Sequence, residues 1–174
     1  MKKIVFLSAL AGILFSCSNS ADNSMSKQGA QNEALTKRFY DEVINAHDVA
    51  KIDTYCSEDF VDHNPDNGHS GKGLDDLKGQ FNDLFAAIPD AHVTPNFMVA
   101  NGDTVVAYLT MTGTNTGPMG NMPATNKSFK MDGIDIIIIK DGKAIERWGI
   151  FDNLSMMAQL GMMGGGEAPA DNAN

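Results

Sequence analysis

The sequence predicts an α+β domain in which helices come first and long antiparallel strands follow. The first half of the domain carries apolar residues at helical spacing, and the second half carries alternating apolar residues around Asn101-Gly102 and Asp141-Gly142. These dipeptides are typical of two-residue hairpin turns, because both turn positions need positive φ angles. Helices packed on one side of a sheet are therefore expected.

The helices are predicted from apolar stripes. One stripe covers residues 35–46, and a broader one covers residues 74–88 and ends before Pro89, because the residue before a proline disfavours helical geometry. Between the two stripes we expect a short helix over residues 49–56 and an extended segment over residues 59–64.

The strands are predicted as two hairpins. Residues 92–100 and 103–113 flank the first turn, and residues 131–152 contain the second, which a short helix follows. Residues 114–126 between the hairpins are rich in Gly, Pro, Asn and Met without any period. We expect a long loop there, of the kind that is usually functional or mobile.

The second hairpin suggests a pocket. If Asp141 and Gly142 form the turn, Lys140 faces Lys143, and a constant register places Asp135 opposite Trp148. Period-2 alternation then gathers six residues on one face: Asp135, Ile137, Ile139, Trp148, Ile150 and Asp152. The other face is also largely apolar, so both faces should be covered. Helices cover only one side of a sheet, so we expect a homodimer.

The ends of the chain predict a lipoprotein of the bacterial envelope. Two lysines precede an apolar run shorter than the about 20 residues of a membrane span, and Ser16 precedes Cys17,. An ordinary cleaved signal is the alternative. Ser18 after the cysteine favours the outer membrane, facing the periplasm, by analogy with enteric sorting. The expected divisions are a signal peptide (1–16), lipidated Cys17 with a flexible tether (17–33), a domain (34–161) and a disordered tail (162–174).

Charge excludes one class of partner. Loss of Lys2 and Lys3 with the signal peptide would change the net charge from −9 to −11. Such a surface repels phosphate backbones, so no nucleic acid is expected to bind. Cys56 would be the one remaining free thiol, so no intramolecular disulfide is expected. A buried inert thiol and a nucleophile are the two interpretations of Cys56.

Ten short segments occur in a characteristic order. They are Phe60–Pro65, Gly71–Leu74, Ile88–Ala91, Asn101–Val105, Gly113–Gly117, Gly133–Ile136, Asp141–Lys143, Glu146–Trp148, Phe151-Asp152 and Gln159–Gly161. Together they resemble the SnoaL-like polyketide cyclase (ester cyclase) family over nearly the whole domain. The resemblance implies the cone-shaped fold of nuclear transport factor 2, ketosteroid isomerase and scytalone dehydratase, which bind small hydrophobic molecules in the cone.

The resemblance also implies candidate site residues. Asp152 is the expected acid/base of an intramolecular aldol ring closure, and His63 is an expected polar partner. Asp135, which the strand alternation places on the same face, is the other expected polar partner, and an inward-facing acid satisfied by hydrogen bonds is the alternative for it. Apolar neighbours would raise the pKa of Asp152, but a helix N-cap is an equally serious interpretation of this residue. His63 could instead make a structural hydrogen bond. The expected ligand-binding residues are Tyr40, Phe81, Phe85, Tyr108, Met122, Trp148 and Ile150, for most of which a purely structural role is the alternative.

These observations leave two functions open. The domain either isomerises or cyclises a small hydrophobic carbonyl compound or captures such a compound without catalysis, and a hydrolase is a weaker third option. Asp62, His63, Asp66 and His69 lie close together in the sequence, but their spacing matches no strong metal-ligand pattern. Neither a metal nor a cofactor is expected.

Overall fold

The computed structural model describes residues 18–66 and 68–163. The expected signal peptide, the lipidation of Cys17 and nearly all of the expected tail lie outside these residues. The elements are α1 (Ser18–Phe39), η1 (Tyr40–Ile44), η2 (Val49–Lys51), α2 (Ile52–Tyr55), β1 (Cys56–Asp62), α3 (Gly73–Ala87), β2 (His92–Asn101), β3 (Thr104–Thr114), β4 (Ser128–Lys140), β5 (Lys143–Phe151) and α4 (Asn153–Leu160).

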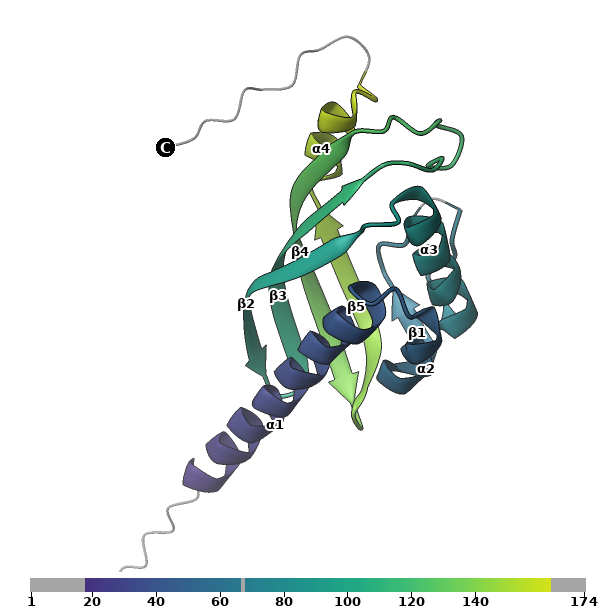
Figure 1. The fold of residues 1–174 in the computed structure, drawn as a ribbon. Coiled ribbons are helices and arrows are strands. Elements are labelled where there is room, and N and C mark those ends of the chain that lie inside the picture. Colours follow the sequence, from purple (N-terminus) through teal and green to yellow (C-terminus); the bar gives the residue numbers. More distant parts are fainter. Residues whose placement is uncertain (1–17, 67, 164–174) are drawn as a thin grey trace, which may run out of the picture.

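The predicted α+β fold is confirmed. The strands form one curved, open sheet in the order β1-β5-β4-β3-β2, and α1 and α3 lie on the same side of it (Figure 1). Strands β2 to β5 pair in antiparallel fashion, whereas β1 pairs parallel to β5. The sheet and the helices together give the cone shape that the resemblance implied.

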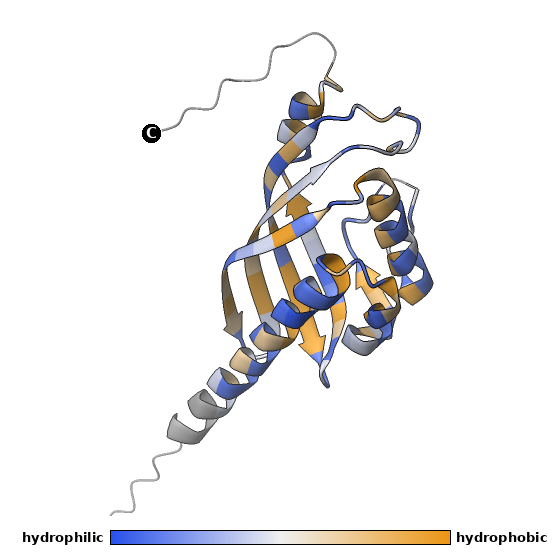
Figure 2. Cartoon of the chain, in the orientation of Figure 1, coloured by the Kyte–Doolittle hydropathy of each residue, from blue (hydrophilic) through white to orange (hydrophobic). Residues whose placement is uncertain are grey.

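The core lies between the helices and the inner face of the sheet. Strand β3 alternates strictly, so that Val105, Ala107, Leu109 and Met111 are buried against the helices, as expected for a strand with period 2. Figure 2 shows hydrophobic residues along the strands of the sheet. Tyr40 in η1 is fully buried in this core.

Helix α1 begins at Ser18, where the sequence predicted a flexible tether to residue 33. The helix packs on the turn between β2 and β3 through polar groups. The Asn32 side chain is buried and donates from Nδ2 to the Gly102 carbonyl over 2.9 Å. Gly29 lies against Ala100, where an added Cβ would approach the carbonyl oxygen to 3.1 Å. No helix among the described residues is long and apolar enough to cross a membrane.

The second hairpin has the predicted turn but a different register. Asp141 and Gly142 have φ angles of 51° and 75°, and Lys140 pairs with Lys143. The register then shifts by one residue, because Ile139 pairs with Ala144 but Ile138 pairs with Glu146. This β-bulge exchanges the two faces of the rest of β5. The predicted pairing of Asp135 with Trp148 is therefore wrong, and Asp135 lies opposite Gly149.

Candidate active site

A cavity of about 980 Å³ lies between the inner face of the sheet and the helices. Most of its wall is apolar, with Phe39, Phe60, Phe81, Leu109, Met131 and Ile137 among the lining residues. A preformed apolar cavity of this size with few polar groups is the usual form of a small-molecule site. The polar side chains that line it therefore decide which ligands it suits.

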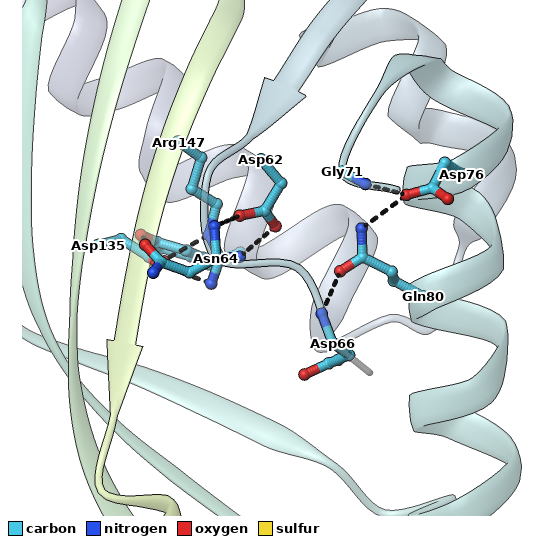
Figure 3. A network of polar contacts seen from close by, with 9 residues as sticks. Asp62, Asn64, Asp66, Gly71, Asp76, Gln80, Asp135 and Arg147 are labelled. Atoms are coloured by element: carbon cyan, nitrogen blue, oxygen red, sulfur yellow. Dashed lines mark hydrogen bonds and ion pairs between the residues drawn. The ribbon is translucent and has the colours of Figure 1, made fainter. Parts of the chain in front are cut away.

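Arg147 is the centre of the polar wall. Its Nε and Nη2 atoms lie 2.8 Å from Asp135 Oδ1, and its Nη1 donates to Asp62 Oδ2 over 2.8 Å (Figure 3). The Tyr40 hydroxyl donates to the second Asp135 oxygen over 3.0 Å. The two carboxylates are almost completely buried, so this network joins β1, β4, β5 and η1 inside the cone.

The network has defined protonation states. Burial alone would lower the pKa of Arg147, but the charges of Asp135 and Asp62 outweigh it and raise that pKa further above its usual range. Burial, followed by the charge of Asp135, raises the pKa of Tyr40 well above its usual value. Arg147 is therefore a permanent cation and Tyr40 a neutral donor. A guanidinium has five N–H bonds. Three of them reach the two carboxylates, and no described residue accepts from the other two.

Gly149 gives Arg147 the space for this position. Residues 147 and 149 face the same side of β5, and both line the cavity. A Cβ added at Gly149 would lie 2.2 Å from Arg147 Nη2 and 2.5 Å from Cζ. A glycine inside a strand often marks such a close approach. Gly149 was therefore a signal in the sequence, but the predicted register turned Arg147 away from the site.

The loop between β1 and α3 forms another part of the cavity wall. The Asn64 amide donates to Asp62 Oδ1 over 3.0 Å, and the Asp66 amide donates to Gln80 Oε1 over 3.1 Å (Figure 3). Gln80 in turn donates to Asp76, which also accepts from the Gly71 amide. These bonds fasten the loop to α3, and the side chain of Asp66 lines the cavity.

Asp66 is electrostatically unusual. No described residue donates a hydrogen bond to its carboxylate. Burial is the main cause that raises the pKa of Asp66, and Asp62 and Asp83 add to the effect, whereas Arg147 and His69 oppose it. A carboxylate of this kind accepts a proton more readily than an ordinary aspartate does.

Two of the three expected catalytic residues lie outside the cavity. Asp152 is exposed and caps α4, because its Oδ1 accepts from the Ser155 amide over 2.9 Å. His63 stacks on Trp148 with ring centroids 4.1 Å apart, and its Nε2 lies 2.8 Å from Glu146. Only Asp135 lines the cavity, and the β-bulge is the reason that it shares the site with Arg147 instead of Trp148.

Some of the expected ligand-binding residues line the cavity and the others do not. Tyr40, Phe81 and Met122 line the cavity. The other four lie elsewhere: Phe85 stacks on His47, the Tyr108 hydroxyl donates to Asp132, Trp148 covers His63 and Ile150 is 63% exposed. Trp148 and Ile150 point to the outer face of the sheet, opposite to the expectation, because of the same one-residue shift.

Other reactive groups give little support to a different chemistry. Burial raises the pKa of the Cys56 thiol to about 12, which favours the inert interpretation of this residue over the nucleophile. Within residues 18–66 and 68–163 no group of three or more His, Cys, Asp or Glu side chains is arranged to hold a metal ion.

The fold and the cavity define a cone-shaped α+β domain with an internal cavity. The chain belongs to the SnoaL-like polyketide cyclase family, whose profile matches residues 34–160. A comparison with curated proteins finds no significant match.

Similar solved structures agree with this assignment. TsrD from Streptomyces laurentii is 26% identical to this chain, with a TM-score of 0.69. The match covers 77% of this chain and 97% of the TsrD chain. IdmH from Streptomyces antibioticus, described as a candidate polyketide cyclase, is 27% identical with a TM-score of 0.67, over 75% and 99% of the two chains.

Proposed function

We propose that the cone binds a small, mainly apolar molecule and that Arg147 anchors a carbonyl-type oxygen of this ligand. The observation that carries the proposal is a guanidinium in the wall of a mainly apolar cavity, with two N–H bonds that no described residue accepts. A buried donor of this kind favours a ligand with a matching acceptor, because an unmatched donor loses its hydration without compensation.

The charges around Arg147 favour a neutral ligand over an anionic one. Asp62 and Asp135 both contact the guanidinium, so the three groups together carry one negative charge. A carboxylate ligand would add a second negative charge in a partly desolvated site, which is unfavourable. A ketone or aldehyde oxygen can accept from Arg147 without this repulsion.

Acid/base isomerisation or intramolecular cyclisation is the second candidate function. A candidate cyclase such as IdmH has the same fold, and Asp66 adds to the cavity a carboxylate that no described residue hydrogen-bonds. The alternative without catalysis is capture of the same kind of ligand by an envelope protein.

Titration of the purified protein with β-tetralone, a small apolar ketone, tests the binding proposal. We expect Arg147→Lys to keep the positive charge but lose the forked geometry, and to weaken binding about tenfold, or about 1.4 kcal/mol. Asp152→Asn is the matched control, since Asp152 lies outside the cavity. Equal affinity of Arg147→Lys and the unchanged protein, or no binding at all, would contradict the proposal.

We also propose that two copies pair through the outer face of the sheet. Phe97, Val99, Ile134 and Ile150 are 59%, 57%, 43% and 63% exposed on β2, β4 and β5, and exposed apolar patches of this kind often mark interfaces. Light scattering should give a dimer mass that Ile150→Lys reduces to a monomer. Leu154→Lys, at an exposed apolar position on α4, should remain dimeric. A monomeric mass of the unchanged protein at high concentration would refute the pairing.

Anchoring at Cys17 by lipid, at the periplasmic side of the outer membrane, is a further proposal that the sequence supports. Cells grown with a labelled fatty acid should incorporate the label into this protein and not into Cys17→Ala. Label on both proteins, or on neither, would contradict lipidation at this cysteine.

A further inference from the structure

We propose that Asp66 is the proton-transfer group of the cavity and that Arg147 stabilises the oxyanion that forms when Asp66 removes a proton next to a ligand carbonyl. This inference rests on the proposed binding function, since it requires a carbonyl compound in the cone. It assigns the catalytic step to a loop residue, whereas the sequence pointed to Asp152.

The other carboxylates of the cavity are already engaged. Asp62, Asp66, Asp83 and Asp135 line it. Asp135 contacts Arg147 and accepts from Tyr40, and Asp62 accepts from Arg147 and from the Asn64 amide. Asp83 lies 3.1 Å from His69 Nε2, and its side chain is 79% exposed. A general base needs a lone pair that is free to reach the substrate, and among the described cavity residues Asp66 offers one.

The position of Asp66 suits this role in three respects. Its amide is held by Gln80 Oε1, a side chain that is itself buried, so its backbone is fixed relative to α3. Arg147 acts on it electrostatically from β5, so base and oxyanion donor belong to the same cavity. Asp66 is also exposed to solvent, which allows its proton to exchange with water after each turnover.

The surroundings of Asp66 make it a stronger base than an ordinary aspartate. It faces Asp62 from β1, Asp83 from α3, His69 from its own loop and Arg147 from β5, and burial together with the two acids raises its pKa. A general base is most effective when its pKa approaches the working pH. Arg147 opposes this rise, but its larger role is to lower the energy of the enolate.

The step is balanced without a cofactor. An Asp66 oxygen takes the α-proton, the C–H electron pair becomes the C=C bond of the enolate, and the carbonyl π pair moves to the oxygen beside the Arg147 N–H groups. In an isomerisation, Asp66 returns the proton to a different carbon. In a ring closure, the enolate carbon bonds to a second carbonyl carbon of the same molecule, and the Asp66 proton goes to the alkoxide.

Deuterium exchange at the α-carbons of β-tetralone tests the inference, because this exchange needs only the first step and its reversal. NMR in deuterated buffer should show faster exchange with the protein than with buffer alone. We expect Asp66→Asn to lower the protein-dependent rate about 100-fold or more while the affinity for β-tetralone stays within about twofold. Asp152→Asn should exchange like the unchanged protein.

Two further measurements separate proton transfer from a structural role of Asp66. The exchange rate should rise with pH and level off above the pKa of Asp66, because only the carboxylate accepts a proton. Formate should restore exchange to Asp66→Ala in proportion to its concentration, since a small carboxylate can occupy the vacated space.

The outcomes distinguish the two proposals. If β-tetralone binds but no protein-dependent exchange occurs, or if Asp66→Asn exchanges at the full rate, the assignment of Asp66 is overturned and the binding function stands. If β-tetralone does not bind, the proposed function fails and this inference fails with it.

Discussion

Replacement of Gly149 by alanine should displace Arg147 and destabilise the protein although it adds only one methyl group. An ideal Cβ at this position lies 2.2 Å from Nη2, 2.5 Å from Cζ and 2.9 Å from Nη1 of Arg147, so the whole guanidinium must move. Its contacts with Asp62 and Asp135 are all 2.8 Å long, and a shift large enough to relieve the clash breaks at least one of them.

The expected loss follows from the burial of the carboxylates. Breaking a buried ion pair destabilises a protein by about 3–5 kcal/mol. Arg147 retains 25% side-chain exposure and can swing into the cavity, so we expect a smaller loss of about 2–4 kcal/mol. At roughly 2–4 °C per kcal/mol for a domain of this size, the melting temperature should fall by about 5–15 °C. Urea unfolding followed by the fluorescence of Trp148, the single tryptophan, measures the free energy.

A double-mutant cycle identifies the cause. In an Arg147→Ala background the clash disappears, so Gly149→Ala should then cost less than about 0.5 kcal/mol. Additive effects of the two substitutions would refute the reasoning, since the loss at Gly149 would then not depend on the guanidinium.

Four further predictions use other parts of the structure. Tyr40→Phe leaves Asp135 with one donor fewer and should reduce the free energy of unfolding by about 1.5–3 kcal/mol in urea titrations; an unchanged value would contradict the bond. Cys56, whose pKa burial raises to about 12, should react with iodoacetamide at pH 8 only after unfolding, as mass spectrometry would show. Because the pKa of Asp66 is raised in the folded state, the folded state binds more protons, so its contribution to stability falls as pH rises above the ordinary aspartate pKa; Asp66→Asn should remove this decline from unfolding curves, and an identical pH dependence in both proteins would refute it. Asp152→Asn keeps a capping oxygen and should change the melting temperature by less than about 2 °C, whereas a large fall would show that Asp152 does more than cap α4.

The sequence predicted the fold well because its strongest signals are local. The helical stripe that ends before Pro89 and the Asn101-Gly102 and Asp141-Gly142 turns depend on backbone geometry within a few residues. The predicted flexible tether before residue 34 is instead part of helix α1, which begins at Ser18. Asn32 and Gly29 dock α1 on the turn after β2, and a polar contact with a distant turn leaves no apolar period in the sequence.

The site was harder to predict because it depends on which alternate residues of β5 face the cavity. A turn fixes only the first pairs of a hairpin, and the bulge near Ile145 has no signature in a run of β-branched and charged residues. The shift placed Arg147 in the cavity and Trp148 outside it. Residues from β1 and from the loop after it, Asp62 and Asp66, complete the site, and their proximity to Arg147 arises from the parallel pairing of β1 with β5, a long-range contact.

The bulge decides which face of β5 lines the cavity. Deletion of Ile145 would remove the bulge but keep Glu146 opposite Ile138. If Ile145 were instead retained and paired with Ile138 in a regular ladder, every residue from Glu146 to Phe151 would point to the opposite face of the sheet. The indole of Trp148 would enter the cone, the guanidinium of Arg147 would leave it, and Asp62 and Asp135 would remain behind without a counter-ion. Loss of the bulge with Ile145 still present would therefore turn the inner face of β5 outward, whereas deletion of Ile145 would leave the orientation of Arg147 intact.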